Sequence, residues 1–432
     1  MTDDPGVRTD LQPADDSRVS TELSVDEAQA IIAGGVMPVP EVEQVTLQNG
    51  LGRVLAETIF SPIDVPAYDN AAMDGYAFCS GDLQADRPAC LQLIGTVSAG
   101  DSWSRVVGRN ECLRIMTGAR MPAGCDIVIA RERVQPSAES YICFDSSAVS
   151  PGDNCRRAGE DLPAGGVALA AGTLIQPAHL GVIASLGIGN MTVRRRVRVA
   201  FFSTGNELRS IGDPIDPGCI YDSNRYTLLG MLMRLGCEPI DMGIVKDQPE
   251  ALETAFRSAC VSADVVISSG GMSVGVADHV QMVMARLGEV AHWTLRMRPG
   301  RPLAFGHLHT DAGTTCVFGL PGNPVAVMAA FYFLVRPALR KMMGITDSSS
   351  PAQMFKAMAV AGIAKRSGRL EYQRGILSPD GNGAPQVRLT GAQGSGMLSS
   401  MAQANCIVVL GAAQGDIASG ELVDIVPFDG LI

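Results

Sequence analysis

The sequence has 432 residues, a formal net charge of −11 and an apolar content of 46%. A chain of this length exceeds what one ordinary hydrophobic core supports, so we expect several domains. The acidic balance argues against general nucleic-acid binding, and any anionic ligand must then be held by a local cluster of donors. The 11 cysteines are scattered singly with no CxxC pair, which is typical of reduced thiols and argues against a zinc site.

Hydrophobic periodicity and turn residues divide the chain into regions of different character. Short β-prone runs between Gly, Pro and Asp turns predict β-rich regions, and alternating strands and helices predict an α/β region. The polar N-terminus lacks the basic and apolar parts of a signal peptide. The predicted regions are a disordered tail at 1–20, a discontinuous N-terminal domain at 21–61 and 151–193, a β-rich domain at 62–150, an α/β domain at 194–347 and a C-terminal β domain at 348–432.

The first predicted element is a helix that begins at Ser24, which has capping-box spacing to Glu27. Gly34 and Gly35 end this helix. A strand follows, then the short strands of the β-rich domain, then one helix in the second part of the N-terminal domain. The strands are expected at 42–47, 90–97, 111–116, 126–130 and 140–144, and the helix at 178–186.

Residues 195–345 have the clearest pattern, because apolar strand-like runs alternate with helical segments. Such alternation predicts a mostly parallel sheet with helices on both faces. The last helix has an apolar part that is too short to span a bilayer, which favours a buried core helix and no membrane association. The predicted strands are 197–202, 239–245, 265–268, 290–297 and 316–320, and the predicted helices are 224–235, 250–260, 278–287 and one starting at Asn323-Pro324.

The fold class predicted from these elements is multidomain α/β plus β. It combines a central three-layer α/β/α domain, whose sheet is mostly parallel, with a β-rich inserted domain. A small C-terminal β-barrel-like domain completes the chain, and no period of solenoid type is present.

Small residues follow the predicted strands of the α/β domain. Ligands of such sheets bind beyond the carboxyl ends of the strands. Small residues let backbone N–H groups approach a ligand, and helix starts add partial positive charge that suits an oxyanion. One Gly-rich turn is more often structural, but four such loops on one edge favour a phosphate-type site. The loops are Ser203–Glu207, Lys246-Asp247, Ser268–Ser273 and Gly319–Pro324.

The same edge carries charged side chains of both signs. Carboxylates at Glu207, Asp247 and Asp278, beside phosphate-type loops, indicate Mg²⁺ that bridges to a ligand. Asp278 alone could equally be a helix N-cap. The segment Arg296–Pro302 adds arginines with planar donors for tetrahedral anions, and its alternative is a solvated basic turn.

The β-rich domain holds a second group of polar residues. Two acids flank the small-residue turn within Asp69–Tyr76, and Thr117-Gly118 follows a predicted strand. Either feature could bind a ligand or stabilise a local turn, and composition leaves both readings open.

Sequence motifs resemble those of the MoeA/gephyrin-E family. They extend collinearly from about residue 24 to the end of the chain. The motifs are YDNAAMDGYA, LRIMTGARMP, RRAGEDLPAG, FFSTGNEL, IYDSNR, ISSGGMSVGVADHV, RPGRPLAFG, GLPGNPVAV, YQRG and GAQGSGMLSS.

The resemblance implies a four-domain subunit and an elongated homodimer, and the unpatterned cysteines favour a cytoplasmic protein. It implies a molybdopterin molybdenumtransferase, in which Mg²⁺ supports transfer of molybdate to the dithiolene of adenylylated molybdopterin with release of AMP. The active site would lie between the α/β domain of one subunit and the β domain of the other. Implied partners are the molybdopterin adenylyltransferase and acceptor molybdoenzymes or their chaperones, with no nucleic acid and no membrane.

Functional family positions carry over to this chain motif by motif. The catalytic positions implied are Asp74, Thr117, Asp161, Glu207, Asp247 and Asp278, of which Glu207, Asp247 and Asp278 are the metal positions. The binding positions for cofactor and anion are Gly270, Gly271, Ser273, Arg298, Arg301, Gly322, Asn323, Arg374 and Ser395.

Several positions depart from the family pattern. Asn206 and Val276 replace carboxylates, Thr294 replaces a lysine and Ala326 replaces a serine, while arginines replace the usual lysines at 298 and 301. A working transferase is the expected reading. Its alternatives are a molybdopterin adenylyltransferase-type activity, which SSGGMSVG in place of a TTGGTG-type loop disfavours, and a reduced-activity or scaffolding paralogue. The sequence does not distinguish molybdate from tungstate.

Overall fold

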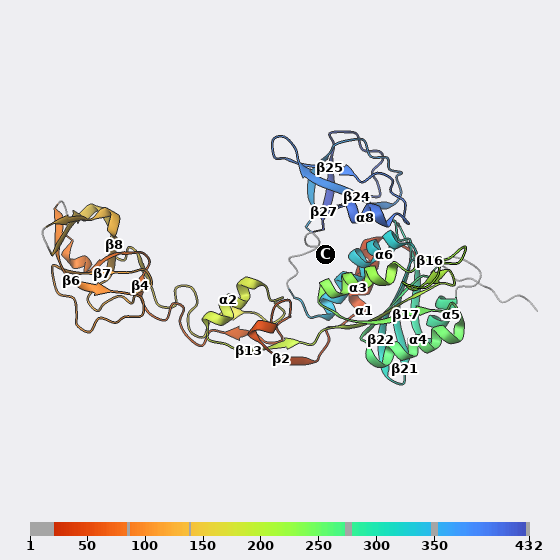
Figure 1. The fold of residues 1–432 in the computed structure, drawn as a ribbon, viewed down its shortest axis with the longest axis horizontal. Helices are drawn as coiled ribbons and strands as arrows, with labels where there is room; N and C mark the ends of the chain where they lie inside the picture. The colour runs from red at the N-terminus through yellow and green to blue at the C-terminus, as the bar shows by residue number, and fades with distance from the viewer. Residues whose placement is uncertain (1–20, 84–86, 138–139, 273–278, 347–352, 429–432) are drawn as a thin grey trace, which may run out of the picture. The chain divides into compact units, whose positions relative to one another are not determined.

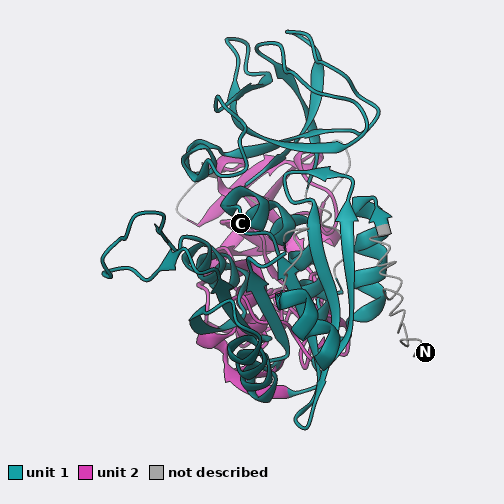
Figure 2. Cartoon of the chain, turned by 90° about the vertical axis from the view of Figure 1, so that its right-hand side faces the viewer, with its two compact units in different colours: residues 1–41, 194–432 teal, residues 42–193 magenta. Residues whose placement is uncertain are grey.

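The computed structural model describes residues 21–83, 87–137, 140–272, 279–346 and 353–428. The chain divides into two compact units, residues 1–41 with 194–432 and residues 42–193, which Figure 2 shows in different colours. The sequence assigned residues 21–41 to the N-terminal domain, whereas the structure groups them with the α/β domain. The reason is packing: helix α1 (Val25–Gly35) lies against the last helices of that domain, and Gln29 donates to the carbonyl of Phe333.

The first unit is built around a seven-stranded sheet. Four of its strand pairs are parallel, as predicted, and both pairs that involve β21 are antiparallel. The order across the sheet is β1 (Thr21–Leu23), β19 (Gly288–Leu295), β21 (Pro302–Thr310), β22 (Gly313–Leu320), β18 (Val265–Ser269), β14 (Arg198–Thr204) and β17 (Glu238–Val245).

Helices cover both faces of this sheet (Figure 1), which confirms the three-layer α/β/α prediction. Helices α1, α3 (Asn224–Leu235), α6 (Pro324–Ala330) and α7 (Arg336–Met342) lie on one face, and α4 (Pro249–Ser262) and α5 (His279–Leu287) lie on the other. Successive side chains of β14 point to opposite faces of the sheet. Ala200 and Phe202 share one face and pack into the core beneath α4 and α5. A π-helical turn, Phe331–Val335, joins α6 to α7, and its residues are buried as the sequence predicted.

Two strands of the sheet were absent from the sequence prediction. Strand β1 is only three residues long and lies next to the predicted disordered tail. Strand β21 follows the basic segment directly and forms a hairpin with β22 through a short turn at 311–312. Neither strand belongs to the alternating series of strands and helices on which the α/β prediction rested. Both are stabilised by pairing with neighbouring strands of the sheet.

The C-terminal part of the first unit is a small barrel. The order is β20 (Met297–Arg298), β24 (Leu370–Pro379), β25 (Pro385–Leu389), β23 (Phe355–Ala359), β27 (Leu422–Pro427) and β26 (Cys406–Leu410), and a β24–β26 pairing closes five of these strands. This confirms the predicted β-barrel-like domain. Strand β20 belongs to the basic segment of the α/β domain, so Met297 and Arg298 pair with Leu370 and Glu371 of the barrel. Helix α8 (Leu398–Gln403) and the strand pair β15 (Leu208–Arg209) and β16 (Ile220–Tyr221) complete the unit.

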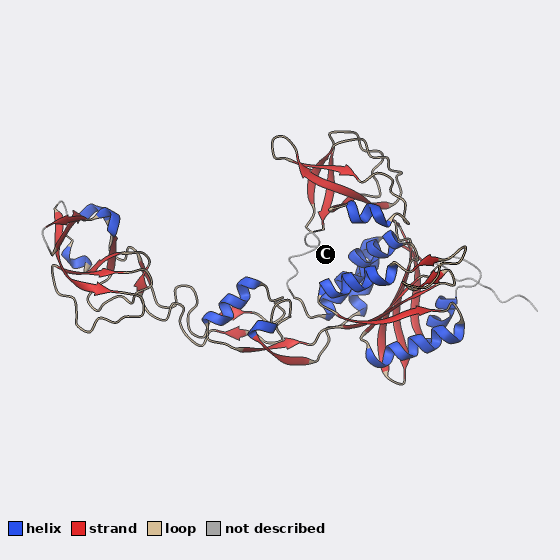
Figure 3. Ribbon diagram, viewed as in Figure 1, coloured by secondary structure: helices blue, strands red, loops and turns tan. Residues whose placement is uncertain are grey.

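The second unit is mainly β-structure, as Figure 3 shows by colour. Its six-stranded sheet has the order β8 (Ile127–Ala130), β5 (Gly75–Phe78), β7 (Glu111–Ile115), β6 (Pro88–Val97), β10 (Tyr141–Asp145) and β9 (Gln135–Ser137). Three small pairs are β4 (Asn70–Ala71) with β11 (Cys155–Arg156), β3 (Ile59–Phe60) with β12 (Val167–Leu169), and β2 (Val42–Thr46) with β13 (Asn190–Arg194). The helical elements are α2 (Pro177–Ser185) and the 3₁₀ turns Leu47–Asn49, Ser80–Asp82, Arg131–Arg133 and Ser146–Ala148.

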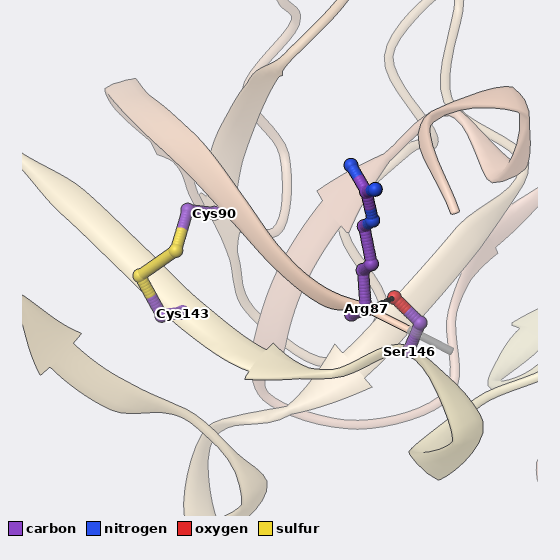
Figure 4. Close-up of a disulfide and its surroundings, with 4 residues drawn as sticks. All are labelled: Arg87, Cys90, Cys143 and Ser146. Carbon is purple, nitrogen blue, oxygen red and sulfur yellow. Dashed lines mark hydrogen bonds between the residues drawn. A yellow bond between two sulfur atoms is a disulfide. The ribbon is translucent and has the colours of Figure 1, made fainter. Parts of the chain in front are cut away.

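The expectation that all thiols are reduced is wrong for one pair. Cys90 on β6 and Cys143 on β10 form a disulfide, shown in Figure 4. They lie directly opposite each other in the antiparallel register of these strands, which a separation of 53 residues in sequence conceals. The remaining cysteines, all within the described ranges, are free thiols. No helix in the described ranges is long and apolar enough to cross a membrane.

Candidate functional site

The carboxyl ends of four parallel strands meet at one edge of the seven-stranded sheet. Ser203 of β14 pairs with Ser269 of β18, and Ser269 in turn pairs with Leu320 of β22. Thr204 pairs with Val245 at the end of β17. The four loops singled out in the sequence therefore lie side by side.

These loops, the basic segment and one loop of the barrel surround a cavity of about 1180 Å³. All of its lining residues belong to the first unit. The predicted site residues that line it are Glu207, Asp247, Gly270, Gly271, Arg298, Arg301, Gly322, Asn323 and Ser395.

Two glycines after β18 are required by the geometry of the loop. Gly270 has φ +95° and Gly271 has φ +65°, a backbone region that side chains disfavour. A Cβ at Gly270 would lie 2.3 Å from the carbonyl oxygen of Thr204, and one at Gly271 would lie 2.3 Å from Val280. The chain therefore places bare backbone against the end of β14 at the cavity.

Besides Asp222, described below, the carboxylate residues Glu207 and Asp247 line this cavity. Glu207 folds back over its own loop, since a Cβ at Gly205 would lie 2.6 Å from one carboxylate oxygen of Glu207. The Oδ1 atom of Asp247 is buried, has no hydrogen-bond partner among the residues that the structure describes, and lies 3.5 Å from Nδ1 of His279. Among the described residues no cluster of three or more His, Cys, Asp or Glu side chains could hold a metal. The pair still fits Mg²⁺, which typically binds one or two carboxylates together with water and substrate phosphates.

The two arginines of the basic segment that line the cavity, Arg298 and Arg301, have only long contacts to acids among the described residues. Arg298 lies 3.8 Å from Glu371 of the barrel, and Arg301 lies 3.8 Å from Glu22. Both arginine side chains are more than half exposed, at 64% and 51%. Such weakly held cations are available for an anionic ligand.

A third cavity arginine was missed by sequence reasoning. Arg369 is exposed, lines the cavity and immediately precedes β24. It is brought there by the β20–β24 pairing, in which Leu370 lies beside Met297. The sequence signal was weak, because Arg369 stands outside any glycine-rich loop and five residues before the arginine of the YQRG motif.

Arg374, predicted to contact the anion, does not line the cavity. Its side chain is 1% exposed and donates to Ser400 and to backbone carbonyls of the loop 391–396. Burial lowers the pKa of Arg374. The residue therefore supports the cavity loop from beneath.

Two further cavity residues come from the IYDSNR motif. Asp222 is 2% exposed and accepts from the Ser203 hydroxyl at 3.0 Å and from the backbone N–H of Arg225 at 3.2 Å. Asn224 donates to the Ser269 hydroxyl at 2.9 Å and to the carbonyl of Gly322 at 2.7 Å. These side chains hold three of the strand-end loops together.

Asp74, Thr117 and Asp161 belong to the second unit and are not among the residues that line this cavity. Asp74 accepts from the Thr117 hydroxyl at 2.7 Å and from its backbone N–H at 2.8 Å, and these bonds lower the pKa of Asp74. The backbone of Asp161 donates to the carbonyl of Val65. The structure thus joins Asp74 to Thr117 by hydrogen bonds, and neither residue lines the cavity.

The remaining predicted positions divide into two groups. Ser273, Asp278 and Val276 lie outside the described residues. Of the departures from the family pattern, Asn206 and Ala326 line the cavity, whereas Thr294 lies within β19 and does not. The substitution at position 326 therefore changes the lining of the cavity itself, whereas the substitution at position 294 does not.

Known families match nearly the whole chain. Residues 23–187 match the model of the MoeA N-terminal region (domain I and II), residues 200–341 that of a probable molybdopterin binding domain, and residues 356–428 that of the MoeA C-terminal region (domain IV).

Individual relatives agree with these matches. A molybdopterin molybdenumtransferase of Haemophilus influenzae is 39% identical over 95% of this chain and 100% of its own length. The Nostoc protein of the same name is 36% identical over 88% of this chain and 87% of its own length. The crystal structure of the molybdopterin biosynthesis MoeA protein from Pyrococcus horikoshii superposes with a TM-score of 0.80 at 28% identity, covering 94% of this chain and 100% of that one. The chain is therefore an enzyme of the MoeA family, the family to which these molybdopterin molybdenumtransferases belong.

Proposed function

We propose that this enzyme of molybdenum cofactor biosynthesis inserts molybdate into adenylylated molybdopterin, with Mg²⁺ required and AMP released. The observation that carries the proposal is the composition of the cavity. It combines the carboxylates of Glu207 and Asp247, the weakly paired Arg298 and Arg301, the exposed Arg369 and bare strand-end glycines within one set of loops. Both substrates are anions with tetrahedral oxygen groups, which need cations and N–H donors in fixed positions.

Each group of cavity residues has a distinct task in this reaction. Arg298, Arg301 and Arg369 attract and orient molybdate and the phosphates of the adenylylated pterin. Gly270 and Gly271 let the backbone approach these oxygens. Glu207 and Asp247 would hold Mg²⁺, which when bound supplies a Lewis acid for the phosphate bond that breaks.

We further propose that the enzyme acts as a cytoplasmic homodimer whose site also uses Asp74, Thr117 and Asp161 from the partner subunit. Support comes from the chemistry of these residues. Asp74 is an ionised carboxylate held by Thr117, and such a preformed polar pair suits substrate contact better than fold stability at an exposed site.

The experiment that tests the function is in vitro assembly with purified protein, adenylylated molybdopterin, molybdate and Mg²⁺. We expect AMP to appear in step with molybdenum cofactor, as measured by chromatography and by reconstitution of an apo-molybdoenzyme. Omission of molybdate or Mg²⁺ should suppress both products. If the protein instead consumes ATP and molybdopterin and releases pyrophosphate, it is an adenylyltransferase. If it binds the substrates without turnover, it is a reduced-activity paralogue.

Asp247→Asn should lower AMP release by at least about a hundredfold, because a metal site contributes several kcal/mol of transition-state stabilisation. The melting temperature should stay unchanged, since Oδ1 of Asp247 makes no hydrogen bond to any described part of the fold. Glu289→Gln is the matched control, an exposed carboxylate on β19 outside the cavity, and should leave both values at wild-type level. A large drop in melting temperature with normal AMP release would contradict the assignment.

Arg369→Gln should raise the KM of an anionic substrate about tenfold, which is the value of one hydrogen bond to a charged group. Arg388→Gln, an exposed arginine on β25 of the same barrel, should leave KM unchanged. Steady-state kinetics with molybdate and adenylylated molybdopterin varied in turn would identify the substrate concerned. Unchanged KM values for both would remove Arg369 from the site.

A further inference from the structure

The strand pair β15–β16 borders the cavity and has two faces of different chemistry. The two strands are parallel, and Leu208 lies beside Ile220 while Arg209 lies beside Tyr221. Successive side chains of a strand point to opposite faces of the ladder. Leu208 and Ile220 therefore share one face, and Arg209 and Tyr221 share the other.

The aliphatic face, formed by Leu208 and Ile220, is the one turned toward the cavity. Both of its residues line the cavity, whereas Arg209 does not. The guanidinium of Arg209 lies 3.3 Å from the carboxylate of Asp216, which is also absent from the lining. The charged side chain of the strand pair is thus bound elsewhere, and the pair presents uncharged aliphatic groups to the cavity.

Contacts on both sides of β16 fix the position of the aliphatic face. The hydroxyl of Tyr221 donates to the carbonyl of Asp213 at 3.0 Å, in the segment 210–219 that joins the two strands. The carboxylate of Asp222 accepts from the hydroxyl of Ser203 at 3.0 Å and so ties the end of β16 to the end of β14. The aliphatic face is therefore attached to the same strand ends that carry the glycine loops.

The cavity has more room than an oxyanion requires. Its volume of about 1180 Å³ exceeds the roughly 300–1,000 Å³ of pockets that bury a whole small-molecule ligand. Ile220 is 57% exposed although it lies in a paired strand. One exposed aliphatic side chain is ordinary, but here two lie side by side in the lining of a cavity that also contains arginines. Such a cavity suits a ligand with an apolar part and an anionic part.

We propose that Leu208 and Ile220 form the surface on which a planar nitrogen heterocycle of the substrate lies, while its phosphate reaches the cavity arginines. The inference rests on the proposed function, whose adenylylated pterin contains two such rings, the adenine and the pterin. The flat faces of both rings are poorly hydrated compared with their polar edges. Contact with aliphatic side chains removes apolar area from water and so favours binding.

Ile220→Ser should raise the Kd of adenylylated molybdopterin by about tenfold, the value of burying part of one aliphatic side chain. The Kd of molybdate should not change. Ile220→Leu keeps an aliphatic surface and should bind like wild type. The matched control is Ile211→Ser, because Ile211 lies in the joining segment 210–219, is 65% exposed and does not line the cavity. Calorimetric titration measures each Kd.

Titration of the same variants with AMP, hydroxymethylpterin and inorganic phosphate identifies the ring. Weaker binding of AMP by Ile220→Ser assigns the aliphatic face to adenine, and weaker binding of hydroxymethylpterin assigns it to the pterin. Phosphate affinity should stay at the wild-type value in either case. Equal losses for phosphate and AMP would mean that the substitution displaces the anion-binding groups, and the proposal would then be wrong.

Two further outcomes would overturn the proposal. One is wild-type affinity of Ile220→Ser for adenylylated molybdopterin, whether or not sedimentation shows a changed oligomeric state. The other is an equal loss in Ile220→Leu and Ile220→Ser. The titrations do not require turnover, so they separate this proposal from the proposed reaction. Weaker heterocycle binding in a protein that releases no AMP would support the aliphatic face alone, and normal binding in a variant that releases AMP would support the reaction alone.

Discussion

Gly270→Ala should reduce AMP release by at least about tenfold and destabilise the protein by about 1–3 kcal/mol, the cost of a side chain in a strained backbone region. Gly270 has φ +95°, and an added Cβ would lie 2.3 Å from the carbonyl oxygen of Thr204. That neighbour is backbone at the end of a central strand and cannot move aside. Relief of the clash must therefore shift the loop after β18, which lines the cavity.

Gly230→Ala is the matched control for this substitution. Gly230 lies in the middle of α3, is exposed, and has no atom within 4 Å of an added Cβ. Replacement of a helical glycine by alanine should stabilise the protein by about 0.5–1 kcal/mol. Chemical denaturation of both variants and AMP-release kinetics would measure the effects. Equal stability and activity for Gly270→Ala and wild type would show that the loop tolerates a side chain and does not depend on its bare backbone.

The architecture was largely predictable because it rests on local signals. The capping box at Ser24 and Glu27 is present, α3 ends at Gly236, and the four strand-end loops meet at one edge as parallel strands require. Two elements that the sequence did not predict, β1 and β20, depend on partners distant in sequence, whereas β21 pairs with strands near it in the chain, β19 and β22. Strand β1 exists because it pairs with β19, and β20 because it pairs with the barrel. Pairings of this kind leave little trace in a short segment.

The site was predictable at the strand ends and less so in the barrel. Glu207, Asp247 and the glycines were found because loops after parallel strands have a known position. Arg369 and Arg374 show the limit of prediction from the sequence. Arg369 immediately precedes β24 and Arg374 lies within it, and only their surroundings in the fold distinguish their roles. One reaches the cavity beside the β20–β24 pair, and the other turns into the barrel beneath the loop. Asp222 was missed because its contact to Ser203 joins two separate loops.

Mixtures of inactive Asp74→Ala and Asp247→Ala chains should recover activity if the site is shared between two subunits. Asp74 and Asp247 lie in different compact units, and Asp74 is not among the residues that line the cavity containing Asp247. In a homodimer with shared sites, a mixed dimer has one site with both defects and one site with neither. A single-chain site would instead leave each site of the mixed dimer with one defect and no activity.

The size of the recovery is as informative as its presence. Random reassociation of equal amounts makes half of the dimers mixed, so about a quarter of wild-type activity is expected from the symmetry of a closed dimer. Tandem affinity purification with two different tags would isolate the mixed dimers, in which about half of wild-type activity per dimer should then be found. Mixed dimers that exchange and purify normally but release no AMP would exclude the shared site. Asp74 would then act within its own chain, or its Thr117 pair would have only a local structural role.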